Sequence, residues 1–227
     1  MSSYLKEQFK KFIDPQQVTT VFEIGSRDAK DAIAVSRFYN AQSTYVFEPN
    51  PRAIAECKKN IAGDERIKLV EAAASDQSGT IEFFPVVESY QPGGVQTDNF
   101  GASSLLRASG LYGETYIQES ITVQSIRADD FCRSNDINSI SLLLMDVQGA
   151  EVSVLQGFGD YLYRIKYIIT EATIVNQYSG QAQLHHINDF LVKNGFRLVS
   201  VDMENYWGFG NFLYINSVIE VPLVGSN

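Results

Sequence analysis

One glycine and one glutamate form the most informative chemical pattern in this sequence. Gly25 follows the apolar run 20–24, and Glu48 closes a second apolar run, 44–47. A glycine at a strand-to-helix turn lets the backbone approach a ligand, and an acidic residue about 20 positions later can accept hydrogen bonds from ribose hydroxyls. The separation of 23 residues between Gly25 and Glu48 fits this spacing. The pair therefore predicts a site for an adenosine-containing ligand.

Acidic residues close four of the predicted strands: Glu23, Glu48, Asp146 and Glu171. The carboxyl ends of parallel strands border one crevice, so these side chains should line the same cleft. A single acid at a strand end is usually a helix cap or part of a solvated rim. Four together crowd like charges, which costs stability unless a ligand, a cation or a proton is present. The group predicts a functional cleft.

The glycine turn also limits which adenosine compound fits. The chain lacks a glycine-rich loop ending in Lys-Ser/Thr, as a nucleoside triphosphate would require. A dinucleotide wants three glycines and a helix N-terminus free for pyrophosphate, whereas this turn has one glycine and Asp28 at the start of the helix. S-adenosylmethionine has a sulfonium, an ammonium and no phosphate, and Glu23 suits such a cation. It is the predicted cofactor, with Gly25 and Ser26 in the binding turn.

The elements that position these residues alternate between strand and helix. Segments that are apolar on both faces predict buried parallel strands, and segments of helical periodicity lie between them. The two last strands are too close for a helical crossover, so they must form an antiparallel hairpin. The pattern predicts an α/β fold with a doubly wound, mostly parallel sheet. The predicted strands are 20–25, 44–48, 66–71, 140–146, 167–171, 196–202 and 210–216, and the helices are 28–39, 51–61, 127–134, 149–157 and 182–193.

Two regions lie outside this alternation. Residues 3–13 have near-helical apolar spacing and predict an N-terminal helix within 1–19, ahead of a single domain over 20–227. Strands 79–84 and 121–126 enclose a segment, about 85–120, rich in Gly, Ser, Asn and Gln. A connection of this length is usually a functional lid or a disordered loop. We expect an inserted hairpin and loop region that covers the substrate.

Composition excludes several classes of function. The net charge of −9 argues against a nucleic-acid-binding surface, and no apolar run reaches the length of a membrane span. The N-terminus lacks the charged and apolar regions of a signal peptide. Cys57 and Cys132 lie in predicted helices, as buried reduced thiols would. A cytoplasmic protein is expected.

The sequence resembles the FkbM-type S-adenosylmethionine-dependent methyltransferases over about residues 20–215. The most specific segments are FEPNP at 47–51, which includes Pro49, and DVQGAE at 146–151. The family's usual turn carries Asp, Ala-Asn and a second glycine where this chain has Glu23, Ser26-Arg27 and Ala29, and its usual Asp-Val-Glu-Gly has Gln148 as third residue here. The other similar segments are FEIGSR at 22–27, AAASD at 72–76 and IITE at 168–171.

The resemblance implies a seven-stranded, Rossmann-like methyltransferase sheet whose last strand is reversed. It also implies methyl transfer to an oxygen, commonly a hydroxyl of a sugar, a polysaccharide or a natural product. Gly25 and Glu48 would hold the cofactor as described above, and Ser75 and Asp76 would flank the adenine. Asp146 would lie near the sulfonium.

An oxygen nucleophile must lose its proton, and the candidate bases are Asp146, Glu171, His185 and His186. Asp146 with Glu171 could instead hold Mg²⁺, which prefers carboxylate oxygens, although no metal site is assigned. Tyr206 and Trp207 could stack on a sugar ring or simply pack at the rim.

Other functions remain open at this point. A catalytically idle domain that binds a cofactor or a protein partner, through the N-terminal helix, would fit the departures at Arg27, Ala29 and Gln148. A nicotinamide-dependent reductase is disfavoured by the single glycine. The acceptor would be a small molecule or a saccharide, and a homodimer is one expected assembly.

Overall fold

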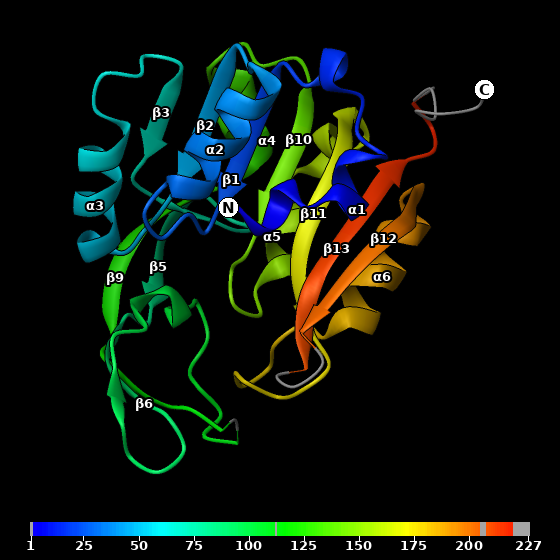
Figure 1. Cartoon of the computed structure of the whole chain (residues 1–227). Helices are drawn as coiled ribbons and strands as arrows, with labels where there is room; N and C mark the ends of the chain where they lie inside the picture. Colours follow the sequence, from blue (N-terminus) through cyan, green and yellow to red (C-terminus); the bar gives the residue numbers. More distant parts are fainter. Residues whose placement is uncertain (1, 112, 205–207, 220–227) are drawn as a thin grey trace.

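The centre of the protein is a seven-stranded sheet. The computed structural model describes residues 2–111, 113–204 and 208–219. The strand order is β12-β13-β11-β10-β1-β2-β3, and β13 is antiparallel to both of its neighbours while the other pairs are parallel (Figure 1). The predicted fold class, including the reversed last strand, is confirmed. The strands are β1 Thr20–Ile24, β2 Ser43–Phe47, β3 Ile67–Val70, β10 Ile140–Met145, β11 Ile165–Thr173, β12 Phe196–Glu204 and β13 Phe209–Asn216.

Helices cover both faces of this sheet (Figure 1). α3 illustrates how the sequence sets a helix: Pro51 occupies its first turn, and the Asn50 side chain accepts a hydrogen bond from the Arg52 amide at 3.1 Å. α2 and α3 pack on one face and α4, α5 and α6 on the other. The helices are α1 Glu7–Lys10, α2 Lys30–Tyr39, α3 Pro51–Ile61, α4 Ala128–Ser134, α5 Glu151–Gly157 and α6 Leu184–Lys193, with 3-10 turns η1 Ser3–Leu5, η2 Pro15–Gln17, η3 Phe100–Ala102 and η4 Gly159–Arg164.

The core consists of layers on the two faces of the sheet. Successive residues of β1 point to opposite faces, so Val21 joins the layer under α2 whereas Phe22 joins the layer under α4 and α5. The Phe22 ring lies 5.4 Å from Phe47 and 6.0 Å from Phe131, measured between centroids. Cys57 and Cys132 are buried in α3 and α4, as predicted. The packed layers hold the carboxyl ends of the strands rigidly.

The chain between β3 and α4 builds two small three-stranded sheets. The predicted strands near 79–84 and 121–126 pair antiparallel as β5 and β9, and β4 joins β9 in parallel. Residues 85–120, expected as a long covering loop, contain a second sheet of order β7-β6-β8 and the turn η3. The bounds are β4 Ala73–Ala74, β5 Gly79–Phe83, β6 Val86–Tyr90, β7 Gln96–Thr97, β8 Thr115–Gln118 and β9 Ile121–Ile126.

The prediction of one continuous N-terminal helix over 3–13 is wrong. The segment forms η1 and α1, separated by Lys6 in an extended conformation with φ −67° and ψ 146°. The break lets Leu5 and Phe9 both bury against the same sheet face, while Lys6 forms an ion pair with Asp202 of β12. No helix in the described part of the chain has the length and apolar character of a membrane span.

Candidate functional site

A cavity of about 440 Å³ lies at the carboxyl ends of β1, β2 and β10. The sheet changes direction at this point, because β2 and β3 extend from one side of β1, whereas β10 and β11 extend from the other. Ligands of open α/β sheets bind at such switch points. Three of the four predicted strand-end acids line the cavity: Glu48, Asp146 and Glu171. We treat this cavity as the candidate active site.

Gly25 lies in the floor of the cavity, where two strand ends meet. Its φ is +81°, and a Cβ at this position would lie 1.8 Å from the Asp146 carbonyl oxygen. The close approach that requires glycine is therefore between the turn after β1 and the end of β10. Arg27 and Ala29, in the same turn, also have positive φ values of 59° and 62°. Such conformations cost free energy in non-glycine residues and persist where the surroundings enforce them.

Glu48 is held by the backbone on both sides of the cavity floor. One carboxylate oxygen accepts a hydrogen bond from the Arg27 amide and the other from the Asn50 amide, each at 2.8 Å. Burial raises the pKa of Glu48 to about 7, and these hydrogen bonds oppose the rise. Each carboxylate oxygen has a second lone pair, so both remain able to accept from a diol. The geometry fits the predicted ribose contact.

Asp146 and Glu171 form a half-buried carboxylate pair connected by Gln148. The Gln148 amide nitrogen lies 2.6 Å from the Asp146 carboxylate and 3.5 Å from that of Glu171. Burial raises the pKa of Asp146 to about 6, and burial together with the Asp146 charge raises the pKa of Glu171 well above its ordinary value. Carboxylates with raised pKa values are suited to accept a proton near neutral pH.

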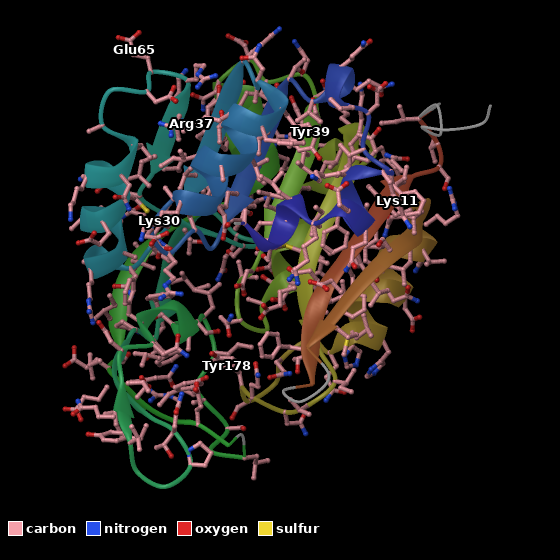
Figure 2. All side chains as sticks on the ribbon, viewed as in Figure 1. Lys11, Lys30, Arg37, Tyr39, Glu65 and Tyr178 are labelled. Atoms are coloured by element: carbon pink, nitrogen blue, oxygen red, sulfur yellow. The ribbon has the colours of Figure 1, made fainter. Side chains whose placement is uncertain are left out.

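Tyr178 lies against the Gln148 amide. Its hydroxyl is 3.0 Å from the amide oxygen, and the amide nitrogen, which donates to the two carboxylates, sets the orientation of the amide. The same hydroxyl lies 2.7 Å from the Ala102 carbonyl oxygen. Figure 2 shows Tyr178 in the connection from β11 to α6, on the side of the inserted region. Tyr178 therefore ties the catalytic strands to the inserted region.

Residues 99–105, which we call the roof segment, line the cavity without interruption. On the side of β2, the Phe100 ring packs against two guanidinium groups, 5.3 Å from Arg27 and 4.6 Å from Arg52. On the side of β10, the Ser104 hydroxyl donates to the Gln148 carbonyl oxygen at 2.8 Å. The roof segment, which belongs to the predicted covering region 85–120, is thus held by contacts on both sides of the cavity.

The remaining predicted site residues divide into two groups. Pro49 lines the cavity, whereas Glu23 and Ser26 bond to each other beneath the Gly25 turn. Burial raises the pKa of Glu23 well above its ordinary value. Three more lie outside the lining: Ser75 is buried against Ser125, Asp76 accepts from Ser153, and His185 with its exposed ring borders a separate depression near α6. Tyr206 and Trp207 lie outside the described residues.

Several lining residues had no signal that the sequence analysis used. Ala72, Ala73 and Ala74 line the cavity, whereas Ser75 and Asp76, the predicted neighbours of the adenine, directly follow them and are not part of the lining. Tyr178 lies in the irregular connection between β11 and α6, where no periodic pattern singles it out. Gln148 departs from the family's usual motif, and the motif gives no sign of its contacts with Asp146 and Glu171. The AAASD segment at 72–76 is the sequence feature that includes these three alanines.

The described residues do not include a cluster of three His, Cys, Asp or Glu side chains arranged to hold a metal ion. The space between Asp146 and Glu171 is faced by the hydrogen-bond donors of Gln148. A cation bound there would meet the positive end of the amide dipole. These residues do not fit the Mg²⁺ alternative.

Comparison of the sequence with known proteins gives consistent matches. A family model described as the Methyltransferase FkbM domain matches residues 23–198. The chain is 33% identical over 175 residues to the 2-O-methyltransferase NoeI of Sinorhizobium fredii, covering 75% of this chain and 70% of NoeI. It is 22% identical over 159 residues to the hexuronic acid methyltransferase AglP of Haloferax volcanii, covering 70% of this chain and 57% of AglP.

Similar solved structures support the fold alone, because their sequence identities are low. The FkbM methyltransferase of Methylobacillus flagellatus gives a TM-score of 0.60 at 10% identity; the match covers 95% of this chain and 48% of the other, so this chain spans about half of its length. Sp1610 of Streptococcus pneumoniae, solved in complex with S-adenosyl-L-methionine, gives a TM-score of 0.52 at 11% identity, with 91% and 70% covered.

Proposed function

Since the chain belongs to the FkbM methyltransferase family, we propose that it transfers the methyl group of S-adenosylmethionine to a hydroxyl of a saccharide. The observation that carries this proposal is the arrangement of Glu48 and the Asp146–Glu171 pair around one cavity, on either side of Gly25. The names of the two relatives, a 2-O-methyltransferase and a hexuronic acid methyltransferase, support an oxygen acceptor on a sugar.

The residues of the cavity fit the cofactor. Glu48 would hold the ribose hydroxyls, and Ala72 and Ala73 offer a small apolar wall to the adenine. Asp146 lines the cavity close to the Gly25 turn, so its carboxylate would lie near the sulfonium, which S-adenosylhomocysteine lacks. When bound, S-adenosylmethionine supplies an electrophilic methyl group on a sulfonium.

The Asp146–Glu171 pair would remove the acceptor's proton. The pair lies at the carboxyl ends of adjacent strands, and Gln148 holds both carboxylates by hydrogen bonds. The raised pKa values give the ionised pair more basicity than ordinary carboxylates have. The roof segment would exclude water and hold the acceptor hydroxyl within attack distance of the methyl group. Such positioning lowers the activation free energy, because the reactants are already oriented when the reaction begins. The cytoplasmic location and a homodimer stay predictions.

Calorimetric titration with S-adenosylhomocysteine tests the cofactor site. Replacing Glu48 with alanine removes two acceptors for the ribose, so the Kd should rise about 100-fold. Glu65→Ala is the matched control, because Glu65 is exposed on the turn before β3 (Figure 2) and is expected to leave the Kd unchanged. Folded protein, free of co-purified cofactor, that gave no heat and no thermal stabilisation would contradict the proposal. That result would favour a catalytically idle domain that binds a protein partner. Binding of NAD would instead favour a nicotinamide-dependent reductase.

Gln148→Glu tests the proton-accepting pair. A third carboxylate beside Asp146 and Glu171 adds a like charge and removes the amide donors, and both changes raise the pKa of the pair. We expect the acidic limb of the pH–rate profile to move up by at least about one pH unit. Gln156→Glu, which adds the same charge on the exposed face of α5, should leave the profile in place. Superimposable profiles for wild type and Gln148→Glu would refute the assignment.

A further inference from the structure

The cavity has two chemically distinct ends, defined by the order of the strands. Glu48 follows β2 and the alanines 72–74 follow β3, so the adenosine end lies on that side of β1. On the other side of β1 lie β10, β11 and β13. The lining residues of β11, of the connection after it and of β13 are Glu171, Gln177 and Phe209. Two lining residues of the inserted region adjoin that connection through Tyr178, and together the five form what we call the acceptor end: Glu114, Tyr116, Glu171, Gln177 and Phe209.

We call the surface made by these five lining residues the wall, and two sets of contacts position its parts. Phe209 is paired with Thr173 across β13 and β11, two residues beyond Glu171. Tyr116 stacks on Tyr178 with ring centroids 6.3 Å apart, and its hydroxyl donates to Glu114 at 2.8 Å. The wall thus continues from the sheet into the inserted region.

We infer that the acceptor is an uncharged glycosyl group, and that the acceptor end selects against sugars that carry a carboxylate or a phosphate. This inference rests on the proposed function and names the substrate class of the same site. It depends on two properties of the wall, its charge and its hydrogen-bonding groups.

The charge of the acceptor end is negative and unbalanced. Arg27 is the only cationic side chain that lines the cavity within the described residues, and its guanidinium group packs on Phe100 together with Arg52 of α3. That location is at the adenosine end. An anionic acceptor would therefore meet Glu171 and Glu114 without a compensating cation. Repulsion between like charges in a site that excludes much of the water lowers the affinity for such an acceptor.

The polar groups of the wall suit hydroxyls. Carboxylates accept hydrogen bonds from sugar hydroxyls, and the amide of Gln177, which is buried, offers both a donor and an acceptor. The rings of Tyr116 and Phe209 can cover the apolar face of a pyranose. An uncharged sugar ring with several hydroxyls can donate hydrogen bonds to the carboxylates of the wall. A carboxylate substituent can only accept hydrogen bonds, so it would face carboxylates of the wall without a donor between them.

Matched acceptor pairs test the inference with the full chain and S-adenosylmethionine. Each pair differs only at carbon 6: 4-nitrophenyl glucoside against the glucuronide, and 4-nitrophenyl galactoside against the galacturonide. Methylated product is measured by mass spectrometry, and binding of the same compounds to the S-adenosylhomocysteine complex is measured by saturation-transfer NMR. We expect kcat/KM for the neutral member to exceed that for the acidic member about 100-fold.

Two variants separate the local charge from the overall charge of −9. Glu114→Gln should lower the neutral-to-acidic ratio about tenfold, because it removes one of the opposing charges. Glu119→Gln makes the same change of net charge at an exposed position between β8 and β9, and the ratio should stay at the wild-type value. The ratio should also persist in about 0.5 M salt, which screens distant surface charges but not groups in contact.

The outcomes distinguish this inference from the proposed function. Equal or faster methylation of the uronide, or equal effects of the Glu114 and Glu119 variants, would overturn the neutral-acceptor inference while leaving the methyltransferase in place. If S-adenosylhomocysteine binds but no glycoside of either kind is bound or methylated, the saccharide acceptor itself is refuted, and the inference falls with it.

Discussion

Replacing Gly25 with alanine is expected to abolish binding of S-adenosylhomocysteine and to destabilise the fold. The new Cβ would lie 1.8 Å from the Asp146 carbonyl oxygen, so the turn after β1 and the end of β10 must separate. The left-handed φ of +81° adds strain for any residue with a Cβ. Together these effects should lower the free energy of unfolding by about 3 kcal/mol or more. Denaturant titration measures the stability, and calorimetry measures the binding.

Gly63→Ala is the control for backbone strain alone. Gly63 has nearly the same φ, +87°, but an added Cβ would have no atom within 4 Å. This variant should lose about 1 kcal/mol of stability and bind S-adenosylhomocysteine as tightly as wild type. If Gly25→Ala were no less stable than Gly63→Ala and bound the ligand normally, the contact between the two strand ends would have no role in the site.

The sheet and its acidic strand ends could be predicted because both depend on local patterns. The residues of β10 are apolar on both faces, a property of the sequence itself, and the short distance between β12 and β13 leaves only a hairpin. Parallel pairing then brings Glu48, Asp146 and Glu171 to one edge without any further information. The turn at Gly25 could be predicted for the same reason, because the separation between Gly25 and Glu48 is a property of the sequence itself.

The support around the acids could not be predicted, because it depends on residues distant in sequence. Gln148 and Tyr178 meet only after the connection from β11 to α6 folds back over the end of β10. The roof segment reaches the same place through the inserted sheets. The N-terminal prediction failed for a related reason: the spacing of apolar residues fits a helix, but burial against the sheet favours an extended Lys6. At such places tertiary packing overrides the intrinsic helix propensity of the segment.

The Asp146 carboxylate should account for most of the rate of methyl transfer. Asp146→Asn is isosteric, and its amide oxygen can still accept from Gln148, so the local geometry should persist. The variant cannot take a proton, and we expect kcat to fall about 100- to 10,000-fold. S-adenosylhomocysteine should still bind, because the Glu48 contacts are unchanged. Single-turnover kinetics with a saturating acceptor would measure the chemical step directly.

The pH dependence gives this prediction a sign. The base must be ionised, so in wild type the rate should fall as the pH drops through the pKa of Asp146, which burial raises to about 6. In Asp146→Asn, Glu171 is the remaining carboxylate of the pair. Its pKa loses the contribution of the Asp146 charge, while the larger contribution of burial and the smaller one of the Glu151 charge remain, so the residual activity should have an acidic limb set by Glu171. A variant with wild-type kcat at pH 8 would exclude Asp146 as the base, and loss of ligand binding in place of rate would assign its carboxylate to the cofactor's ammonium group.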